Sequence, residues 1–401
     1  MAIADSEDRE REGAMATAAA FFRDERRRSF MLQALTLGLV AFGLWYLTTT
    51  TMENLQARSM SAGFGFLDSN AGFSIGFTLI DYKENDSYLR VFWVGVANTM
   101  LVAVISIFFA TVLGLLVGLA RLSQNWLISR LARSYVEILR NTPLLLQIIA
   151  WFFCVFNLLP RPKQSLVWGD AFVLNNRGFY MPAPLPEPAF WAVAGTFFAG
   201  VGFAIWFSRW AKAKADATGD APPVFAIGAA AIVLAPLLVF LATGMPLAWE
   251  APVLKGFNYR GGLEVPPSFC ALVVALSVYT SCFIAEIVRA GIQSVPRGQH
   301  EAAGALNLSH GWKMRRIVLP QAMRVIIPPL ISNYLNVTKN SSLAIAVGFP
   351  DLVSVWMNTA LNQSGRAIPI VAMTMAFYCT VSLTVSVILN WYNARVQIKE
   401  R

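Results

Sequence analysis

The chain has 401 residues, of which 56% are hydrophobic and only 14% are charged. A soluble chain typically carries about 25% charged residues, so this composition excludes an ordinary soluble domain and indicates a membrane protein. The formal net charge is +9, but no patch of interleaved basic and aromatic residues accompanies it, so we predict no nucleic-acid partner.

Long segments without a single charged residue predict the transmembrane helices. A spanning helix needs about 20 mostly apolar residues, because each residue rises about 1.5 Å and the hydrocarbon layer is about 30 Å thick. Seven segments reach this length without a charged residue. An eighth candidate, 321–347, contains Lys339 and the Pro328–Pro329 pair, which we expect to break it. The sequence thus predicts an all-α polytopic membrane protein with about eight transmembrane helices. Seven uncharged segments are long enough: 29–52, 91–120, 141–160, 188–208, 221–249, 265–285 and 367–394.

The distribution of lysine and arginine predicts the orientation of these helices, because short cytoplasmic loops are enriched in both. With the N-terminus inside and eight spans, the cytoplasmic side holds 22 of the 32 basic residues and 13 of the 23 acidic ones. We therefore expect both termini on the cytoplasmic side of a bacterial inner membrane, and membrane lipid around the spans. The predicted cytoplasmic segments are 1–29, 121–140, 209–220, 286–324 and 395–401.

In chain order, a mixed-charge cytoplasmic tail over 1–29 precedes a first helix at 30–50 and a periplasmic segment at 51–90. The main membrane domain follows over 91–401. Within its first helix, Gly114 and Gly118 lie four residues apart and predict close helix packing. The remaining spans are expected at about 133–158, 189–208, 222–243, 268–290, 321–347 and 368–393.

No pattern in the chain predicts catalysis. The sequence contains neither a G-x-x-x-x-G-K-[S/T] phosphate-binding loop nor an H-E-x-x-H zinc motif. Its two histidines, His300 and His310, are more typical of solvent-facing loop residues than of metal ligands. We predict no catalytic residue, no metal and no cofactor in this chain, although an integral-membrane enzyme stays open. The cysteines lie in apolar spans as small packing residues: Cys154, Cys270, Cys282 and Cys379.

The cytoplasmic loop 291–320 has the features of two short helices joined by a sharp turn. Asn307 is suited to end the first helix, because Asn tolerates the left-handed conformation. Ser309 is suited to cap the second helix, and Pro320 suits the first turn of the next span. Such a bent peg, flanked by Lys313, Arg315 and Arg316, is suited to dock into another protein.

This loop resembles the EAA coupling loop of ABC importer permeases, whose pattern is EAA, three residues, Gly, nine residues and I-x-L-P. The spacing agrees throughout, and one residue departs: the glycine of the pattern is Asn307. The resemblance implies a MetI-like permease core with extra helices and coupling to a separate ATPase. The residues that carry it are Glu301, Ala302, Ala303, Gly304, Asn307, Ile317, Leu319 and Pro320.

Three further segments, 135–144, 283–291 and 338–343, resemble signatures of the polar amino-acid permeases. The additional helices at 30–50 and about 189–243 are similar to those of the larger permease of proteobacterial general L-amino-acid (glutamate, glutamine, aspartate, asparagine) importers. The resemblance implies alternating access, with ATP and Mg held by a partner ATPase dimer. It also implies a heterodimer with a second permease, a periplasmic amino-acid-binding protein and an amino-acid substrate.

Two acid–base pairs share a helix face at a spacing of three residues: Glu137 with Arg140, and Glu286 with Arg289. They are either ordinary salt bridges near the lipid boundary, or they brace the coupling loop or gate the inner vestibule. A lysine within a span usually faces the bundle interior or water. We hypothesise that a set around Lys339 lines the translocation path, or alternatively that Lys339 pairs with a carboxylate in packing. This set is Thr338, Lys339, Asn340, Ser341 and Ser342.

Two other classes of function stay open. An ion-driven secondary transporter also has broken helices, but it does not need a coupling loop. A membrane scaffold or channel subunit would bind partners without carrying an amino acid. The companion chains of the isolated complex distinguish the three classes.

Overall fold

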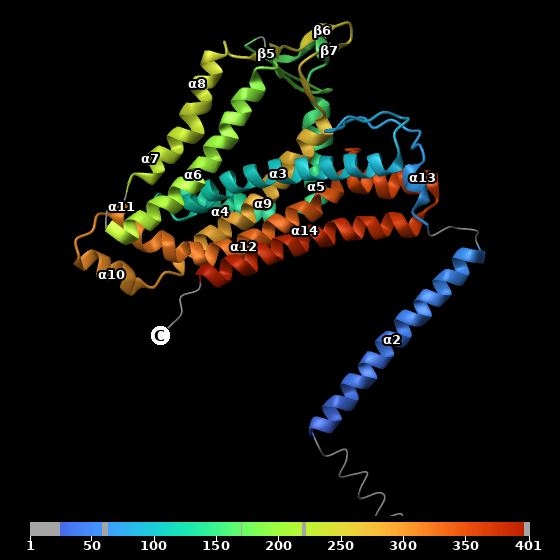
Figure 1. Cartoon of the computed structure of the whole chain (residues 1–401), viewed down its shortest axis with the longest axis horizontal. Helices are drawn as coiled ribbons and strands as arrows, with labels where there is room; N and C mark the ends of the chain where they lie inside the picture. Colours follow the sequence, from blue (N-terminus) through green and yellow to red (C-terminus); the bar gives the residue numbers. More distant parts are fainter. Residues whose placement is uncertain (1–24, 58–62, 170, 219–221, 397–401) are drawn as a thin grey trace, which may run out of the picture.

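The computed structural model describes residues 25–57, 63–169, 171–218 and 222–396, most of which are helical (Figure 1). Within these ranges six helices are long and apolar enough to cross a membrane, and a bent pair adds a seventh. The eighth predicted span is present as helix α12 (Leu319–Asn340), which carries Arg324 and Lys339 and is less apolar than the others. The predicted polytopic helical fold is therefore confirmed. Seven of the eight predicted spans are long and apolar enough to cross a membrane, and α12 is the one that is not.

The predicted first span is α2 (Glu25–Ala57), which lies apart from the other helices (Figure 1). None of its apolar window is buried, so its side chains are left for lipid or another chain. The predicted tail over 1–29 falls outside the described residues up to position 24, and its placement stays a prediction.

The bundle is built around α3 (Tyr88–Arg121) and α9 (Pro267–Gln293), which make the most extensive helix contact described. A Cβ at Gly114 would lie 2.6 Å from Cβ of Ile284, and one at Gly118 would lie 2.9 Å from a carbonyl oxygen of α9. Only glycine allows this approach, so the predicted packing face is confirmed and its partner is α9.

The next span is sharply bent, whereas a single helix was expected over 133–158. Helix α4 (Trp126–Arg140) and the following helical stretch meet at 100°. Pro143 causes the break, because it lacks an N–H and holds the preceding residue extended. The Gln147 side chain stabilises the corner by donating to the carbonyls of α4 and of the break at 2.8 and 3.1 Å. The second half comprises α5 (Leu144–Ala150), η2 (Trp151–Val155) and η3 (Phe156–Leu158).

Helix α12 runs unbroken through Pro328 and Pro329, so the predicted break there is wrong. The loss of two N–H donors is tolerated because packing at Ile326 and Val337 holds the turns on either side. The helix ends instead at Asn340. A 3₁₀ segment, a left-handed Gly348 and a π-helical segment follow before the last span. These elements are η7 (Ser341–Val347), η8 (Val353–Ala360), α13 (Leu361–Ser364) and α14 (Ala367–Val396).

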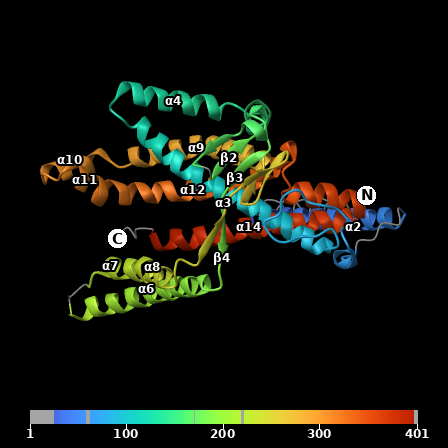
Figure 2. The same ribbon diagram turned by 90° about the horizontal axis from the view of Figure 1, so that it is seen from above.

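The two additional spans predicted at 189–208 and 222–243 form a helical hairpin on one side of the bundle (Figure 2). Its helices pack mainly on each other. A Cβ at Gly200 would lie 2.2 Å from the carbonyl oxygen of Ala231, so this glycine sets the close approach. The hairpin consists of α6 (Phe190–Thr218), α7 (Val224–Ala229), η5 (Ala230–Leu234) and α8 (Ala235–Ala242).

Three small antiparallel sheets, which the all-α prediction missed, flank the hairpin. The largest has the order β1-β2-β3-β8 and pairs Val173 with Tyr180 and Phe179 with Val265. Because β8 leads directly into α9, this sheet joins the two ends of the inserted segment. The strands are β1 (Leu166–Trp168), β2 (Phe172–Asn175), β3 (Gly178–Met181), β4 (Ala183–Pro186), β5 (Leu247–Glu250), β6 (Val253–Lys255), β7 (Asn258–Arg260) and β8 (Leu263–Val265).

Basic segments that are far apart in the sequence gather at one end of the bundle (Figures 1 and 2). They are the α3–α4 connection, the C-terminal end of α6, the loop after α9 and the end of α14. The segment predicted to be periplasmic lies at the other end as η1 (Gly65–Asp68) and extended chain. The loop after α9 contains α10 (Arg297–Ala305), α11 (His310–Lys313) and η6 (Met314–Val318).

Candidate functional site

The loop between α9 and α12 folds as two short helices with a sharp turn, as its sequence predicts. Asn307 adopts φ 51°, the left-handed conformation that ends α10. Its N–H donates to the Gly304 carbonyl at 2.9 Å, and the Leu308 N–H donates to the Ala303 carbonyl at 3.2 Å. This pair of bonds is a Schellman motif, which satisfies carbonyls that the helix end would leave free. Asn307 therefore performs the role of the glycine in the EAA pattern.

The base of this loop is fixed to the bundle by an apolar cluster of Val295, Val318, Ala322 and Ile326. Ala303 is also buried, while Glu301, Ala302 and Gly304 are exposed. The loop is thus anchored on one side and open on the other. A side-chain hydrogen bond of 3.3 Å from Gln321 to Gln299 adds a polar tie between α12 and α10.

The exposed side of the loop carries large apolar residues. The exposed fraction of Leu306 is 74% and that of Trp312 is 59%. The Arg316 guanidinium lies 5.4 Å from the centre of the Trp312 ring, a cation–π arrangement. Apolar side chains at a polar, basic end of the bundle are typical of a protein-docking surface. We call Leu306, Leu308, Trp312 and Arg316 the knuckle; sequence reasoning missed its apolar members, although apolar residues in a polar loop were a visible signal.

The second helix of the loop continues into the membrane without a break. Helix α11 is followed by η6 and then α12, with Pro320 in the first turn of α12 as expected. Ile317 and Leu319 are half-buried on this path. The knuckle is therefore joined to α12 by continuous helical backbone.

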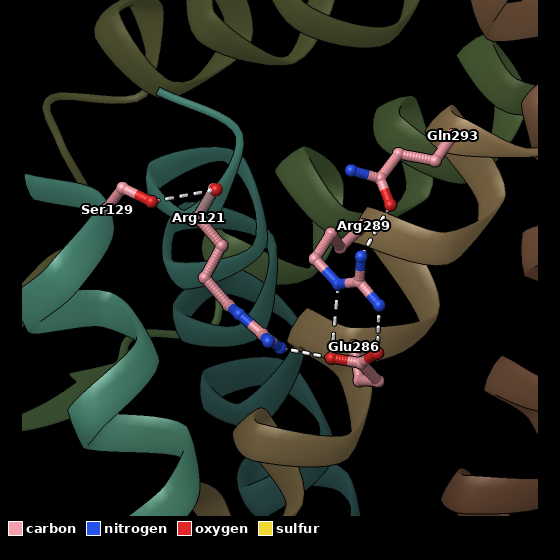
Figure 3. Close-up of polar contacts among 5 residues, drawn as sticks. All are labelled: Arg121, Ser129, Glu286, Arg289 and Gln293. Atoms are coloured by element: carbon pink, nitrogen blue, oxygen red, sulfur yellow. Dashed lines mark hydrogen bonds and ion pairs between the residues drawn. The ribbon is translucent and has the colours of Figure 1, made fainter. Parts of the chain in front are cut away.

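Glu286 lies between two guanidinium groups just before the loop (Figure 3). It pairs with Arg289 one turn later, as predicted, and with Arg121 at the end of α3. Arg289 also donates to the Gln293 side chain, and the Arg121 carbonyl accepts from Ser129 of α4 at 3.2 Å. The group ties α3, α4 and α9 together at the loop end. Arg121 was missed by sequence reasoning, although it is the first charged residue after an apolar span.

The predicted pair of Glu137 and Arg140 does not form among the described residues. Both side chains are exposed, and the Arg140 guanidinium lies 5.4 Å from the centre of the Phe283 ring instead. Arg140 is the last residue of α4 and turns toward α9, away from the preceding turn that carries Glu137. The shared helix face made the pair possible, but the Arg140 guanidinium contacts the Phe283 ring of α9 instead.

The predicted path residues separate into two groups. Thr338 and Ser341 are buried, and their hydroxyls donate to carbonyls of the preceding turn at 3.2 and 2.7 Å. Ser342 is half-buried with a similar bond to the Lys339 carbonyl. The Lys339 side chain is exposed and has no carboxylate at ion-pair distance in the described part of the chain. Asn340 is half-buried at the helix end.

A polar cross-link that the sequence did not reveal holds the segment after α12 against α3. The buried Asn98 side chain donates to the carbonyls of Phe77 and Pro350 at 2.9 and 2.8 Å. The Thr99 hydroxyl accepts from the Leu352 N–H at 3.0 Å. Two backbone groups of the connection between η7 and η8 are thus satisfied by α3 side chains, as buried irregular backbone requires.

Comparison with known proteins agrees with this architecture. A family model described as "Binding-protein-dependent transport system inner membrane component" matches residues 197–398. The permease protein YhdX of Escherichia coli strain K12 is 47% identical, covering 95% of this chain and 97% of that protein. The general L-amino acid transport system permease protein AapQ of Rhizobium johnstonii is 46% identical, with 94% of each chain covered.

A third relative is the glutamate/glutamine/aspartate/asparagine transport system permease protein BztB of Rhodobacter capsulatus. It is 39% identical over 94% of this chain and 96% of its own length. Similarity over nearly the full length of several permeases, together with the family match, places the additional helices within the shared architecture. The chain therefore belongs to the family of inner membrane components of binding-protein-dependent transport systems.

Proposed function

We propose that this chain is one of two related permease subunits of an ABC importer that moves L-amino acids into the cytoplasm by alternating access. Glutamate, glutamine, aspartate and asparagine, or a broader range, are the substrates suggested by the names of AapQ and BztB. The observation that carries the proposal is the anchored loop with a left-handed Asn307 and an exposed knuckle continuous with α12.

Three partners follow from this proposal. A cytoplasmic ATPase dimer binds the knuckle and holds the ATP and Mg that power transport. A periplasmic binding protein delivers the amino acid to the opposite end of the bundle. A second, related permease completes the path as a heterodimer, and the exposed Lys339 with the half-buried Asn340 and Ser342 faces that path.

The proposed orientation has both termini and the knuckle in the cytoplasm of the inner membrane. The gathering of the basic segments at one end of the bundle supports it. Reporter fusions after about residues 70, 175, 215 and 255 test it. A cytoplasmic signal at 70, 175 or 255, or an outer signal at 215, contradicts the orientation.

The coupling role is tested at Asn307 in the purified complex with its ATPase, reconstituted in lipid nanodiscs. Asn307→Pro removes the positive φ and the N–H that donates to Gly304, so we expect binding-protein-stimulated ATP hydrolysis to fall to the basal rate. Asn307→Gly keeps the left-handed conformation and is the matched control, with stimulation close to wild type. Full stimulation in the proline variant, or no ATPase cross-linked to Leu306→Cys, contradicts the proposal.

A further inference from the structure

A basic hollow of about 810 Å³ lies in the inserted segment, where the β2–β3 turn meets the chain that follows η3. Its described lining includes three cationic side chains, Arg161, Lys163 and Arg177, and no acidic one. None of the three lies at ion-pair distance from a carboxylate within the described ranges. The hollow is therefore a concentrated positive charge that no carboxylate of the described residues neutralises.

An unsatisfied acceptor accompanies this charge. Asn176 lines the hollow, and its side-chain Oδ1 is buried without a hydrogen-bond partner in the part of the chain that the structure describes. A buried acceptor left unpaired is costly, so such an atom indicates a missing donor. A ligand of the hollow therefore needs negative groups for the cations and a hydrogen-bond donor for Asn176.

The hollow is held in shape by hydrogen bonds. The fully buried Asn175 accepts from the Arg177 N–H at 2.8 Å and donates to the Ser165 hydroxyl at 3.0 Å. The Asn176 N–H donates to the Pro160 carbonyl at 3.0 Å. These bonds fix the β2–β3 turn against the opposite wall, so the groups that would contact a ligand are positioned in advance.

Further packing places one of the cations. The Lys163 ammonium lies 5.6 Å from the centre of the Phe257 ring, which forms another part of the wall. The adjoining sheet pairs β3 with β8, and β8 leads into α9 at Pro267. The hollow is thus attached to the start of the central helix of the bundle, at the end opposite the knuckle.

We propose that this hollow is a binding site for a free amino dicarboxylate, an amino acid with two carboxylates and one ammonium group. The carboxylates lie against Arg161, Lys163 and Arg177, and the ammonium donates to Oδ1 of Asn176. An acidic protein surface is the alternative that the test separates. A free amino dicarboxylate fits better, because it brings the carboxylates and the ammonium donor together in one molecule small enough to enter the hollow of about 810 Å³. Its role, gathering acidic substrate at the outer face, rests on the proposed function.

The test measures equilibrium binding of radiolabelled L-glutamate to the purified permease–ATPase complex in nanodiscs, without the binding protein. We expect the double variant Arg161→Gln/Arg177→Gln to weaken binding at least tenfold. Arg161→Lys/Arg177→Lys keeps both charges and retains binding within about threefold. Lys255→Gln removes an exposed cation of β6 outside the hollow and is the matched control, with unchanged binding.

A second arm tests the donor. Asn176→Ala is expected to weaken the binding of L-glutamate severalfold. The affinity of the competitor succinate, which lacks an ammonium group, should stay unchanged. Equal glutamate binding by wild type and the glutamine double variant overturns the proposal. A separate docking assay with the binding protein added gives the other contradicting outcome. If the double variant weakens that docking and leaves glutamate binding unchanged, the carboxylates that contact the hollow belong to the binding protein.

The assay reads binding and not uptake, so its failure is distinguishable from failure of the proposed function. If the complex binds no glutamate in the hollow but shows stimulated ATP hydrolysis, only the proposed binding site is contradicted. A complex that binds glutamate here, yet whose hydrolysis never responds to a loaded binding protein, retains the site and loses the proposed import function.

Discussion

Two regions of the molecule are held together in different ways. One is the proposed coupling end of the bundle, which carries the knuckle and the ion pairs of Glu286, and the other is the inserted segment between 159 and 265. At the coupling end, ion pairs and apolar contacts join α3, α4, α9 and α12 into one unit. In the insert, α6 and α8 pack mainly on each other, and the β3–β8 pairing joins them to the bundle. Under the proposed function we therefore expect a push at the knuckle to be transmitted through the core, and the hairpin to contribute little to this transmission.

The strongest test of this difference places the same side chain at a glycine of each region. Gly114→Leu drives a side chain into Ile284, since even a Cβ would lie 2.6 Å away. Overpacking costs about 1–3 kcal/mol and more where backbone must move. We expect the assembled complex to be lost almost completely, measured by co-purification with the ATPase.

The matched change in the insert is Gly195→Leu, because no heavy atom lies within 4 Å of a Cβ at Gly195. Assembly and uptake should stay at wild-type levels. Gly200→Leu extends the comparison: it should disrupt the hairpin, where a Cβ would lie 2.2 Å from the Ala231 carbonyl oxygen, without loss of the core. A core that disassembles equally in all three variants contradicts the separation of the two regions.

A smaller effect is expected from the charged group that braces the coupling end. Glu286→Gln leaves Arg121 and Arg289 facing each other without the carboxylate between them. The loss of charge-assisted hydrogen bonds, partly screened at this site, costs about 1–2 kcal/mol, equivalent to a roughly fivefold to thirtyfold fall in coupled uptake. The control is Glu137→Gln, whose exposed carboxylate makes no described ion pair, and it should transport normally.

The same two regions differ in how far sequence predicts them. At the coupling end the spacing from Glu301 to Pro320 predicts the two short helices, and Asn307 predicts the turn, because these features depend on local backbone preference. The contact of Arg121 with Glu286 was not predicted, because the two residues are 165 positions apart and no local pattern indicates such a contact. The break expected at Pro328 and Pro329 failed because packing outweighs the loss of local hydrogen bonds.

In the insert, long apolar segments predict α6 and α8, but the strands were not predicted. They are only 3 or 4 residues long. The turn at Asn175, Asn176, Arg177 and Gly178, between two apolar stretches, was a hairpin signal. The pairing of β3 with β8 was not predictable, because the α6–α8 hairpin separates the two strands in the sequence.

Lys339 gives the third prediction, intermediate in size. Its exposed ammonium in a spanning helix is costly unless it faces water or a path between subunits. Lys339→Met should leave assembly intact and lower uptake roughly twofold to tenfold, as expected for one polar contact of about 0.5–1.5 kcal/mol. Normal uptake removes Lys339 from the path, whereas loss of assembly assigns it to packing with the second permease.

The smallest effect is expected at Tyr180, the buried centre of the sheet in the insert. Its hydroxyl lies 3.1 Å from Oδ1 of Asn258 and 3.2 Å from Oε1 of Glu264, two acceptors that share its single proton. Burial raises the pKa of Tyr180 from 10.0 to about 12, so the hydroxyl is neutral at physiological pH. Tyr180→Phe removes both bonds and should destabilise the sheet by about 1 kcal/mol without changing uptake.

Hydrogen exchange of the β3 and β8 amides in nanodiscs measures this local change, because a weakly coupled sheet opens independently of the core. A raised pKa contributes stability that is complete below the unfolded-state pKa of 10.0 and is lost as pH rises through about 12. Protection of the wild-type sheet should therefore decline over that interval, and Tyr180→Phe should remove this component of the decline. If Tyr180→Phe also speeds hydrogen exchange of the core amides or lowers uptake, the insert is coupled to the bundle as tightly as the knuckle is.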